Sequence, residues 1–270
     1  MFLYTDIIME ILSYTFFQRA LIGGILISVV FSLFSFFVVV RKLSFAGVGI
    51  SHTAFGGIAL GILLGINPSI SAMIFALVIA IFIAYTSQKK RLHEDAAIGI
   101  FFSFSMAIGI AIISKYHRTT VDIWSFLFGN ITTITRGDLT FFGIITGIVL
   151  LYFFLFFGDL ILLAFDPEVA QSYGVNVKVH NYFFMIMLGV VVIMGIKMVG
   201  VILISAFLVL PATIAFAFSR SFVRIIALSI LFSLIFTIAG LFLSYYLDMP
   251  SGATIVITGT LLFGLTYLKR

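Results

Sequence analysis

Residues 16–42 read FFQRALIGGILISVVFSLFSFFVVVRK, and this stretch decides the fold. No charged side chain occurs between residues 20 and 40. An apolar run of roughly 20 residues is the length at which an α-helix crosses the hydrocarbon core of a bilayer. Two cations, Arg41 and Lys42, follow directly, as is typical of a cytoplasmic membrane boundary. The stretch therefore predicts a membrane-spanning helix over 16–40.

Similar apolar runs recur along the whole chain, which has 270 residues, 63% of them hydrophobic and 9% charged. A soluble globule could not cover this composition with polar surface. The predicted spans are 16–40, 46–66, 69–85, 96–114, 139–164, 182–196, 199–218, 222–247 and 252–268. Two other segments are too short or too polar, so we predict an interfacial helix before residue 16 and a re-entrant piece at 123–135. The expected fold is all-α, a bundle of eight or nine spans in one transmembrane domain, 1–270.

The cations at the breaks predict the orientation, because Lys and Arg concentrate on the cytoplasmic side. One orientation places ten of them inside and leaves five outside. The inside set is Arg41, Lys42, Lys89, Lys90, Arg91, Lys178, Arg220, Arg224, Lys269 and Arg270, and the outside set is Arg19, Lys115, Arg118, Arg136 and Lys197. The N-terminus is then outside and the C-terminus cytoplasmic. This placement also accounts for the net charge of +5 without a nucleic-acid partner.

Histidine and carboxylates are the strong metal-ligating side chains available, since the chain has no cysteine. His52 falls inside the predicted span 46–66. A neutral imidazole suits zinc or manganese and binds either without burying a permanent charge. The alternative is a hydrogen-bonded histidine between helices, which composition alone slightly favours. His93, His117 and His180 lie in loops or at a helix start, where surface or capping roles are expected.

The acidic residues and the motifs of the sequence narrow the possible sources of energy for transport. Asp159 is the one acid clearly inside a predicted span, about one turn from its cytoplasmic end, so an ion-coupled carrier or channel finds little support. No G-x-x-x-x-G-K-[ST] loop is present to hold ATP phosphates, so any ATPase must be a separate subunit. The sequence also offers no convincing pair of catalytic groups. We expect a transport subunit and no enzyme.

A short helix is predicted on the cytoplasmic side at 166–174. Its residues are Asp166, Pro167, Glu168, Val169, Ala170, Gln171, Ser172, Tyr173 and Gly174. Asp is a favourable N-cap, Pro suits the first helical position and Gly commonly follows a helix end. The element is either a well-built loop or a segment that docks into a groove of a peripheral partner.

Glycines 57, 61 and 65 fall four residues apart in the predicted span 46–66. This spacing predicts one smooth helix face that another helix approaches closely. Tight packing is the simpler interpretation of the face, and a sliding surface or the lining of a path is the other.

Several short motifs, taken in order, resemble one known family. They are RKLSF at 41–45, SH at 51–52, GIALG at 57–61, EDAAIG at 94–99, DPE at 166–168, GV at 174–175, LPA at 210–212, SYYLD at 244–248 and PSGA at 250–253. Over almost its entire length the chain resembles the zinc/manganese/iron-type ABC permeases, which are related more distantly to the vitamin B12 and siderophore permeases. The resemblance implies the permease fold of those importers.

The resemblance also implies the rest of the assembly. A homodimer of permeases in a bacterial or archaeal cell membrane would sit on two ABC ATPase subunits, which bind the ATP, and an extracytoplasmic metal-binding receptor would feed it. The cargo would be zinc or manganese, with iron a further choice, and no cofactor is held permanently. Residues 166–174 would be the coupling helix to the ATPase. The alternative function is an ABC permease for a metal chelate or a cobalamin-like ligand.

The chain departs from the family at one expected ligand. The family commonly has an Asp one helical turn before the His of the second span, and here that position is Val48. His52 remains from this pair, so either the metal passes with fewer permease ligands or the substrate preference differs. Oxygen atoms from Ser51 and Thr53 are a separate hypothesis, because adjacent residues point to different helix faces.

Overall fold

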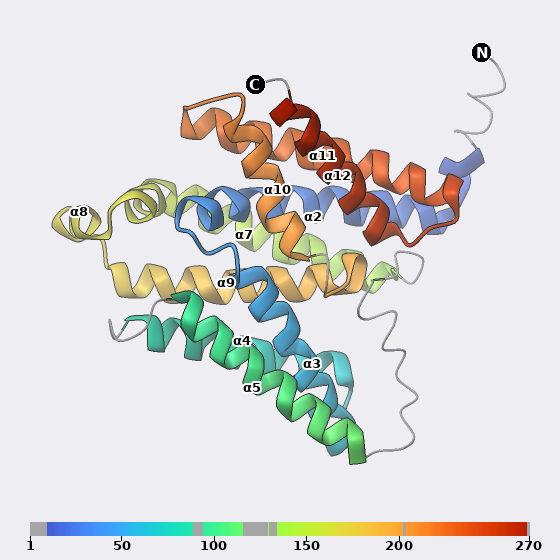
Figure 1. Cartoon of the computed structure of the whole chain (residues 1–270), viewed down its shortest axis with the longest axis horizontal. Helices are drawn as coiled ribbons and strands as arrows, with labels where there is room; N and C mark the ends of the chain where they lie inside the picture. The colour runs from blue at the N-terminus through green and yellow to red at the C-terminus, as the bar shows by residue number, and fades with distance from the viewer. Residues whose placement is uncertain (1–9, 89–93, 116–128, 130–133, 202–203, 269–270) are drawn as a thin grey trace.

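The computed structural model describes residues 10–88, 94–115, 129, 134–201 and 204–268, and within them every regular element is a helix (Figure 1). This confirms the all-α expectation. The helices are α2 (Thr15–Val40), α3 (Ala46–Leu64), α4 (Pro68–Gln88), α5 (Glu94–Lys115), α7 (Arg136–Phe165), α8 (Pro167–Ser172), α9 (Val177–Val199), α10 (Ile204–Phe216), α11 (Phe222–Leu247) and α12 (Ser251–Leu268).

Eight helices in this described part are long and apolar enough to cross a membrane, which confirms the expected eight or nine spans. The structure differs from the predicted spans at 199–218, where the helix α10 has 13 residues. Such a helix is about 20 Å long, shorter than the roughly 30 Å hydrocarbon core. The helical path is interrupted because α9 ends at Gly200, whose φ of 84° and ψ of 161° are not helical. Hydropathy does not register a change of backbone direction inside an apolar run.

Two sequence predictions fall largely outside the described residues. The interfacial helix before residue 16 includes residues 1–9, and the re-entrant piece at 123–135 is described only at Gly129, Ile134 and Thr135. Both stay predictions.

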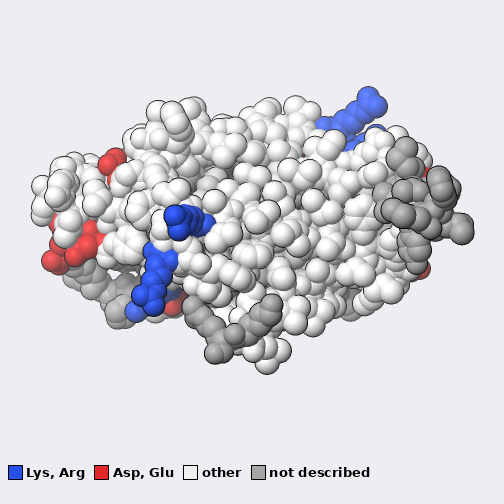
Figure 2. Space-filling view, turned by 90° about the horizontal axis from the view of Figure 1, so that it is seen from above, with Lys and Arg blue, Asp and Glu red and all other residues white. Residues whose placement is uncertain are grey.

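The central helix is α2, which packs against α7, α9, α10 and α11 (Figure 1). On the other side of the bundle, α4 packs against α9, and α3 packs against both α4 and α5. Charged side chains gather toward the two ends of the elongated molecule, and a broad uncharged band separates them in Figure 2. This distribution fits a bundle whose middle lies in lipid and whose ends lie in water.

Aromatic rings and serines hold α2 in place. Phe34 lies 5.1 Å from Phe153 of α7 and 5.2 Å from Phe184 of α9, measured between ring centroids. Toward α11, the Ser28 hydroxyl donates to Thr237 Oγ1 at 2.8 Å. Since lipid offers no hydrogen bonds, such buried hydroxyls pair between helices and fix their register.

Glycines let α3 approach the backbone of α4 closely. A Cβ on Gly57 would lie 2.6 Å from Ala72 Cα, and one on Gly61 would lie 2.9 Å from Pro68 Cα, so both glycines admit the α4 backbone. Gly65 has open space instead and ends α3 with a left-handed φ of 67°. The predicted close approach is thus confirmed for the first two glycines, while the third is a helix cap.

Candidate functional site

The predicted short helix forms at one end of the bundle as α8. The Asp166 carboxylate accepts hydrogen bonds from the backbone N–H groups of Glu168 and Val169, at 2.9 and 3.1 Å. Pro167 occupies the first turn, and Gly174 follows with a left-handed φ of 84°. Cap, proline and glycine act as the sequence predicted. Most of the segment's side chains are exposed, and Ala170 anchors it by being fully buried.

Two polar contacts join α7 and α9, the long helices on either side of α8. Near α8, His180 Nε2 lies 3.5 Å from Asp159 Oδ2. Toward the other ends of the two helices, Lys197 Nζ lies 2.6 Å from Asp138 Oδ2, and Asp138 also completes a capping box with Thr135. With a contact near each end, α7, α8 and α9 form a hairpin that α8 closes.

A kink in α7 lies beside the contact near α8. Phe156 interrupts the helix with φ of −115° and ψ of 18°, and its ring centroid lies 5.2 Å from that of His180. The same imidazole therefore contacts both the kink and Asp159.

Arg41 connects this hairpin to the central helix. It caps the C-terminus of α2, and its guanidinium donates to Asn181 Oδ1 of α9 at 2.8 Å. The guanidinium carbon also lies 4.8 Å from the centre of the Phe184 ring, a cation–π geometry. A hydrogen bond and a ring contact thus tie the start of α9 to the turn between α2 and α3. The sequence assigned Arg41 only to the cytoplasmic boundary, and the pairing with Asn181 carries no signal in the sequence.

His52 lies in the first half of α3 on the face that meets α5. Its ring is partly exposed and meets the Phe102 ring edge to face, with centroids 5.2 Å apart. One turn earlier, a side chain on Gly49 would overlap Ile98 of α5. The helices are therefore in close contact just beside the imidazole. Val48, one turn before His52, is partly exposed as well.

The two neighbours of His52 are turned away from it. Ser51 Oγ donates to the Val201 carbonyl at 3.2 Å, beyond the end of α9, and Thr53 Oγ1 donates to the Ile50 carbonyl at 2.6 Å. Both hydroxyl side chains are fully buried. Successive helical residues point to different faces, so His52 faces α5 without them.

No group of three or more His, Asp or Glu side chains that could hold a metal ion occurs among the described residues. His93 and His117 lie outside those residues, and His180 contacts Asp159. Within the part of the chain that the structure describes, the surroundings of His52 thus offer a single imidazole to a passing ion.

Comparisons with known proteins identify relatives over the whole of this architecture. The model of the ABC 3 transport family matches residues 13–270. The manganese transport system membrane protein MntC of Halalkalibacterium halodurans is 34% identical over 258 residues, which cover 96% of this chain and 88% of the relative. The high-affinity zinc uptake system membrane protein ZnuB of Haemophilus influenzae is 32% identical over 251 residues, 93% and 96% of the two chains.

Solved structures share the fold. PsaBC from Streptococcus pneumoniae, solved in complex with Fab, matches with a TM-score of 0.84 and 32% identity, covering 98% of this chain and 95% of that one. A metal-chelate type ABC transporter in an inward-facing conformation matches with a TM-score of 0.75 and 17% identity, over 94% and 86% of the two chains, and supports the fold alone.

Proposed function

The chain belongs to the ABC 3 transport family, and we propose that it is the membrane-spanning permease of an importer that carries manganese or zinc into the cell. The observation that carries this proposal is the family match over 13–270, together with manganese and zinc relatives that align with more than nine tenths of the chain. The chain forms one transmembrane permease domain over 1–270. The permease moves the ion and performs no covalent chemistry.

ATP binds to a separate ABC ATPase subunit, which docks on α8. Three features support this role: α8 lies at one end of the bundle, its local structure is fixed by the Asp166 cap, and it exposes large side chains. Tyr173, just after α8, is 77% exposed, and Val169 is 41% exposed. A short, capped helix with exposed apolar side chains suits a groove on a partner protein.

Movement of α8 reaches the ion path through α9 and α2. The His180 contact with Asp159 joins α7 and α9 at the α8 end of the hairpin. Asn181 then passes the displacement to Arg41, which lies in the turn leading into α3. Because the packed elements are stiff, a shift at the partner's surface is transmitted to the helix that carries His52.

His52 is the pathway ligand of the transported ion. Its imidazole is partly exposed on the α5 side of α3, and a neutral nitrogen ligand binds manganese or zinc and releases it again without a buried charge left behind. Because Val48 stands in place of an acid, the site binds the ion weakly, which favours passage of the ion over its retention.

The remaining parts of the proposal concern the assembly and its orientation. Two copies of the chain form the transporter in a bacterial or archaeal cell membrane, an extracytoplasmic receptor delivers the ion, and the C-terminus is cytoplasmic. The excess of Lys and Arg on the side that carries α8 supports this orientation.

The test is ATP hydrolysis by the chain reconstituted with its ATPase, with receptor loaded with manganese, zinc or iron in turn. We expect stimulation by manganese- or zinc-loaded receptor, and its loss in His52→Ala while basal hydrolysis and assembly are unchanged. Stimulation by a metal chelate, and by no metal-loaded receptor, would replace the ion with a chelate as cargo. Unchanged stimulation in His52→Ala would remove His52 from the path.

A further inference from the structure

The face of α3 that carries His52 packs closely along α5 (Figure 1). A Cβ on Gly49 would overlap Ile98 of α5, and a Cβ on Gly56 would lie 2.6 Å from the Ser105 carbonyl oxygen. Gly49, His52 and Gly56 are spaced by three and four residues, so they share one face of the helix. The imidazole therefore lies in a seam where α5 is in close contact both before and after it.

Phe102 of α5 lies opposite His52 in this seam. Its ring stands at 81° to the imidazole, with the two ring centroids 5.2 Å apart. The Phe102 ring also meets the ring of Phe45, just before α3, with the centroids 6.5 Å apart. Aromatic rings at these separations are in direct contact, which leaves no room for a water molecule between them. An apolar ring thus covers one side of the imidazole.

Three other residues near the imidazole provide no free oxygen ligand. Val48, one turn before His52, is apolar. The hydroxyls of Ser51 and Thr53 are buried and donate to backbone carbonyls. Since a second copy of the chain carries the same residues, it would bring another imidazole and again no acid at position 48. An ion at His52 therefore meets a nitrogen ligand with apolar side chains beside it.

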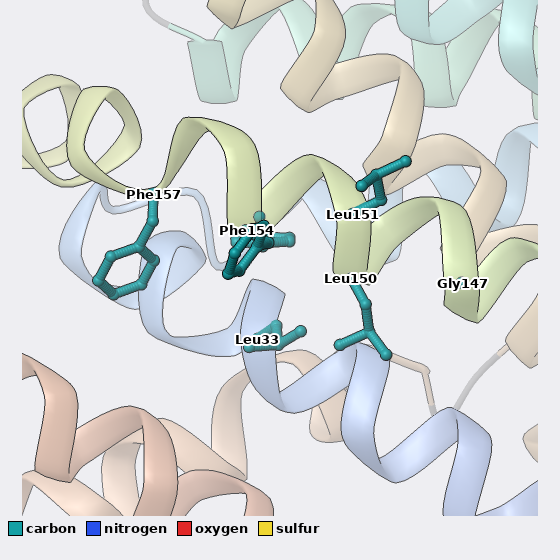
Figure 3. Close-up of a pocket in the computed structure, with 7 residues that line it drawn as sticks. Leu33, Gly147, Leu150, Leu151, Phe154 and Phe157 are labelled. Atoms are coloured by element: carbon teal, nitrogen blue, oxygen red, sulfur yellow. The ribbon is translucent and has the colours of Figure 1, made fainter.

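An apolar groove between α2 and α7 offers the ion no alternative place to bind (Figure 3). Its lining consists of leucine, phenylalanine and glycine, with Leu33, Leu150 and Phe154 among them. None of these residue types has a side chain that ligates a metal. Because the groove is formed by helices other than α3 and α5, substitutions in the His52 seam leave its lining unchanged.

We infer that the His52 seam favours zinc over manganese and that Phe102 sets this preference, which rests on the proposed role of His52 as the pathway ligand. Zinc is commonly held by four ligands, imidazole among them, whereas manganese is typical of six-coordinate sites of carboxylate, carbonyl and water oxygens. The Phe102 ring excludes part of the water that a six-coordinate ion needs, and Val48 supplies no carboxylate. Phe102 is thus a specificity-determining residue that acts through the surroundings of the imidazole.

The experiment measures binding of zinc and of manganese to the purified complex of the full-length chain with its ATPase. Equilibrium dialysis without receptor and without ATP gives the affinity for each ion, and the binding that remains in His52→Ala is subtracted. Phe102→Ser opens the seam to water, whereas Phe102→Leu keeps an apolar cover. Phe104→Ser makes the same exchange at an exposed residue of α5 and is the matched control. Val48→Asp adds a carboxylate one turn from the imidazole.

We expect the native complex to bind zinc more tightly than manganese. Nitrogen ligands in general bind zinc above manganese, so the variants decide the question. Phe102→Ser and Val48→Asp should each raise the ratio of manganese affinity to zinc affinity about ten-fold, as is typical of changes around a metal ligand. Phe102→Leu and Phe104→Ser should leave this ratio unchanged. A loss of stability would weaken both ions alike and would not move the ratio.

An unchanged ratio in Phe102→Ser, or an equal change in Phe104→Ser, would overturn the role of Phe102. If Phe102→Ser does not assemble, Val48→Asp decides, and an unchanged ratio there would overturn the preference. Native binding of manganese as tight as that of zinc would overturn it as well. Equal metal binding by His52→Ala and the native complex would instead refute His52 as the pathway ligand, which separates failure of the proposed function from failure of the zinc preference.

Discussion

Asn181→Ala should uncouple ATP hydrolysis from the arrival of the ion. The asparagine accepts the 2.8 Å hydrogen bond from Arg41, which joins the start of α9 to the turn before α3. The alanine variant removes this acceptor and leaves the backbone of α9 unchanged. Asn181→Asp keeps an oxygen in the same position and adds a charge, so it should preserve the link.

The size of the effect can be worked from the contact. A hydrogen bond to a charged group contributes about 1.5–3 kcal/mol. Arg41 keeps its position 4.8 Å from the Phe184 ring in the variant, so the lower end applies, about 1.5 kcal/mol. If the whole of this energy serves coupling, stimulation by metal-loaded receptor falls about ten-fold.

The assay is receptor-stimulated ATP hydrolysis by the reconstituted complex, measured beside the unfolding free energy of each variant. Asn176→Ala is the matched control, because Asn176 caps α9 through the Val179 N–H at 3.2 Å and touches the same helix end. Loss of this cap lowers the free energy of unfolding by about 1 kcal/mol and leaves the contacts of Arg41 unchanged. If Asn176→Ala and Asn181→Ala reduce stimulation equally, the loss reflects a weakened α9. In that case, or if Asn181→Asp fails to restore stimulation, the proposed route through Arg41 is wrong.

Three further changes test the ion path and the packing. Val48→Asp places a carboxylate one turn from His52, so the variant should hold manganese or zinc more tightly and transport it more slowly. The measurements are the metal content after washing and the rate of uptake. Unchanged metal content would show that the two side chains do not share an ion. Gly57→Ala forces a Cβ to within 2.6 Å of the α4 backbone and should lower the free energy of unfolding by about 1–3 kcal/mol. Gly143→Ala should not lower it, and unfolding by denaturant measures both variants. Ser35→Ala removes the oxygen that accepts the 3.0 Å hydrogen bond from the Ala212 N–H, just after Pro211 in α10. This change should lower the free energy of unfolding by about 1–3 kcal/mol, while loss of the exposed Thr140 hydroxyl should lower it little.

Hydropathy predicted the long helices because each one is continuous in the sequence and must be apolar to lie in lipid. It placed the boundary between two spans at residues 196–199, whereas the helix continues to Val199 and ends at Gly200, since that residue changes the backbone direction without changing polarity. The 166–174 helix was predicted closely because its cap and its glycine are local features of the sequence. Local signals of this kind do not depend on which helices pack together.

The surroundings of His52 could not be predicted, because they depend on which helix face meets which neighbour. The sequence placed His52 in a span and left its partner open, and the structure supplies Phe102 from a different helix. Ser51 illustrates the same limit: the residue next to the imidazole pairs with Val201, 150 positions further along the chain. Contacts of this range are set by tertiary packing.

Asp159 shows how a long-range contact changes a functional argument. As the one acid clearly inside a predicted span, it was the residue on which an ion-coupled carrier could have rested. In the structure its side chain is 42% exposed and lies 3.5 Å from His180, near the end of α7 that leads into α8. A carboxylate in that position is not fully buried and has His180 as a partner on another helix, so it needs no transported cation to offset its burial. The acid therefore belongs to the base of the hairpin that α8 closes, the end of the bundle at which we propose that the ATPase docks.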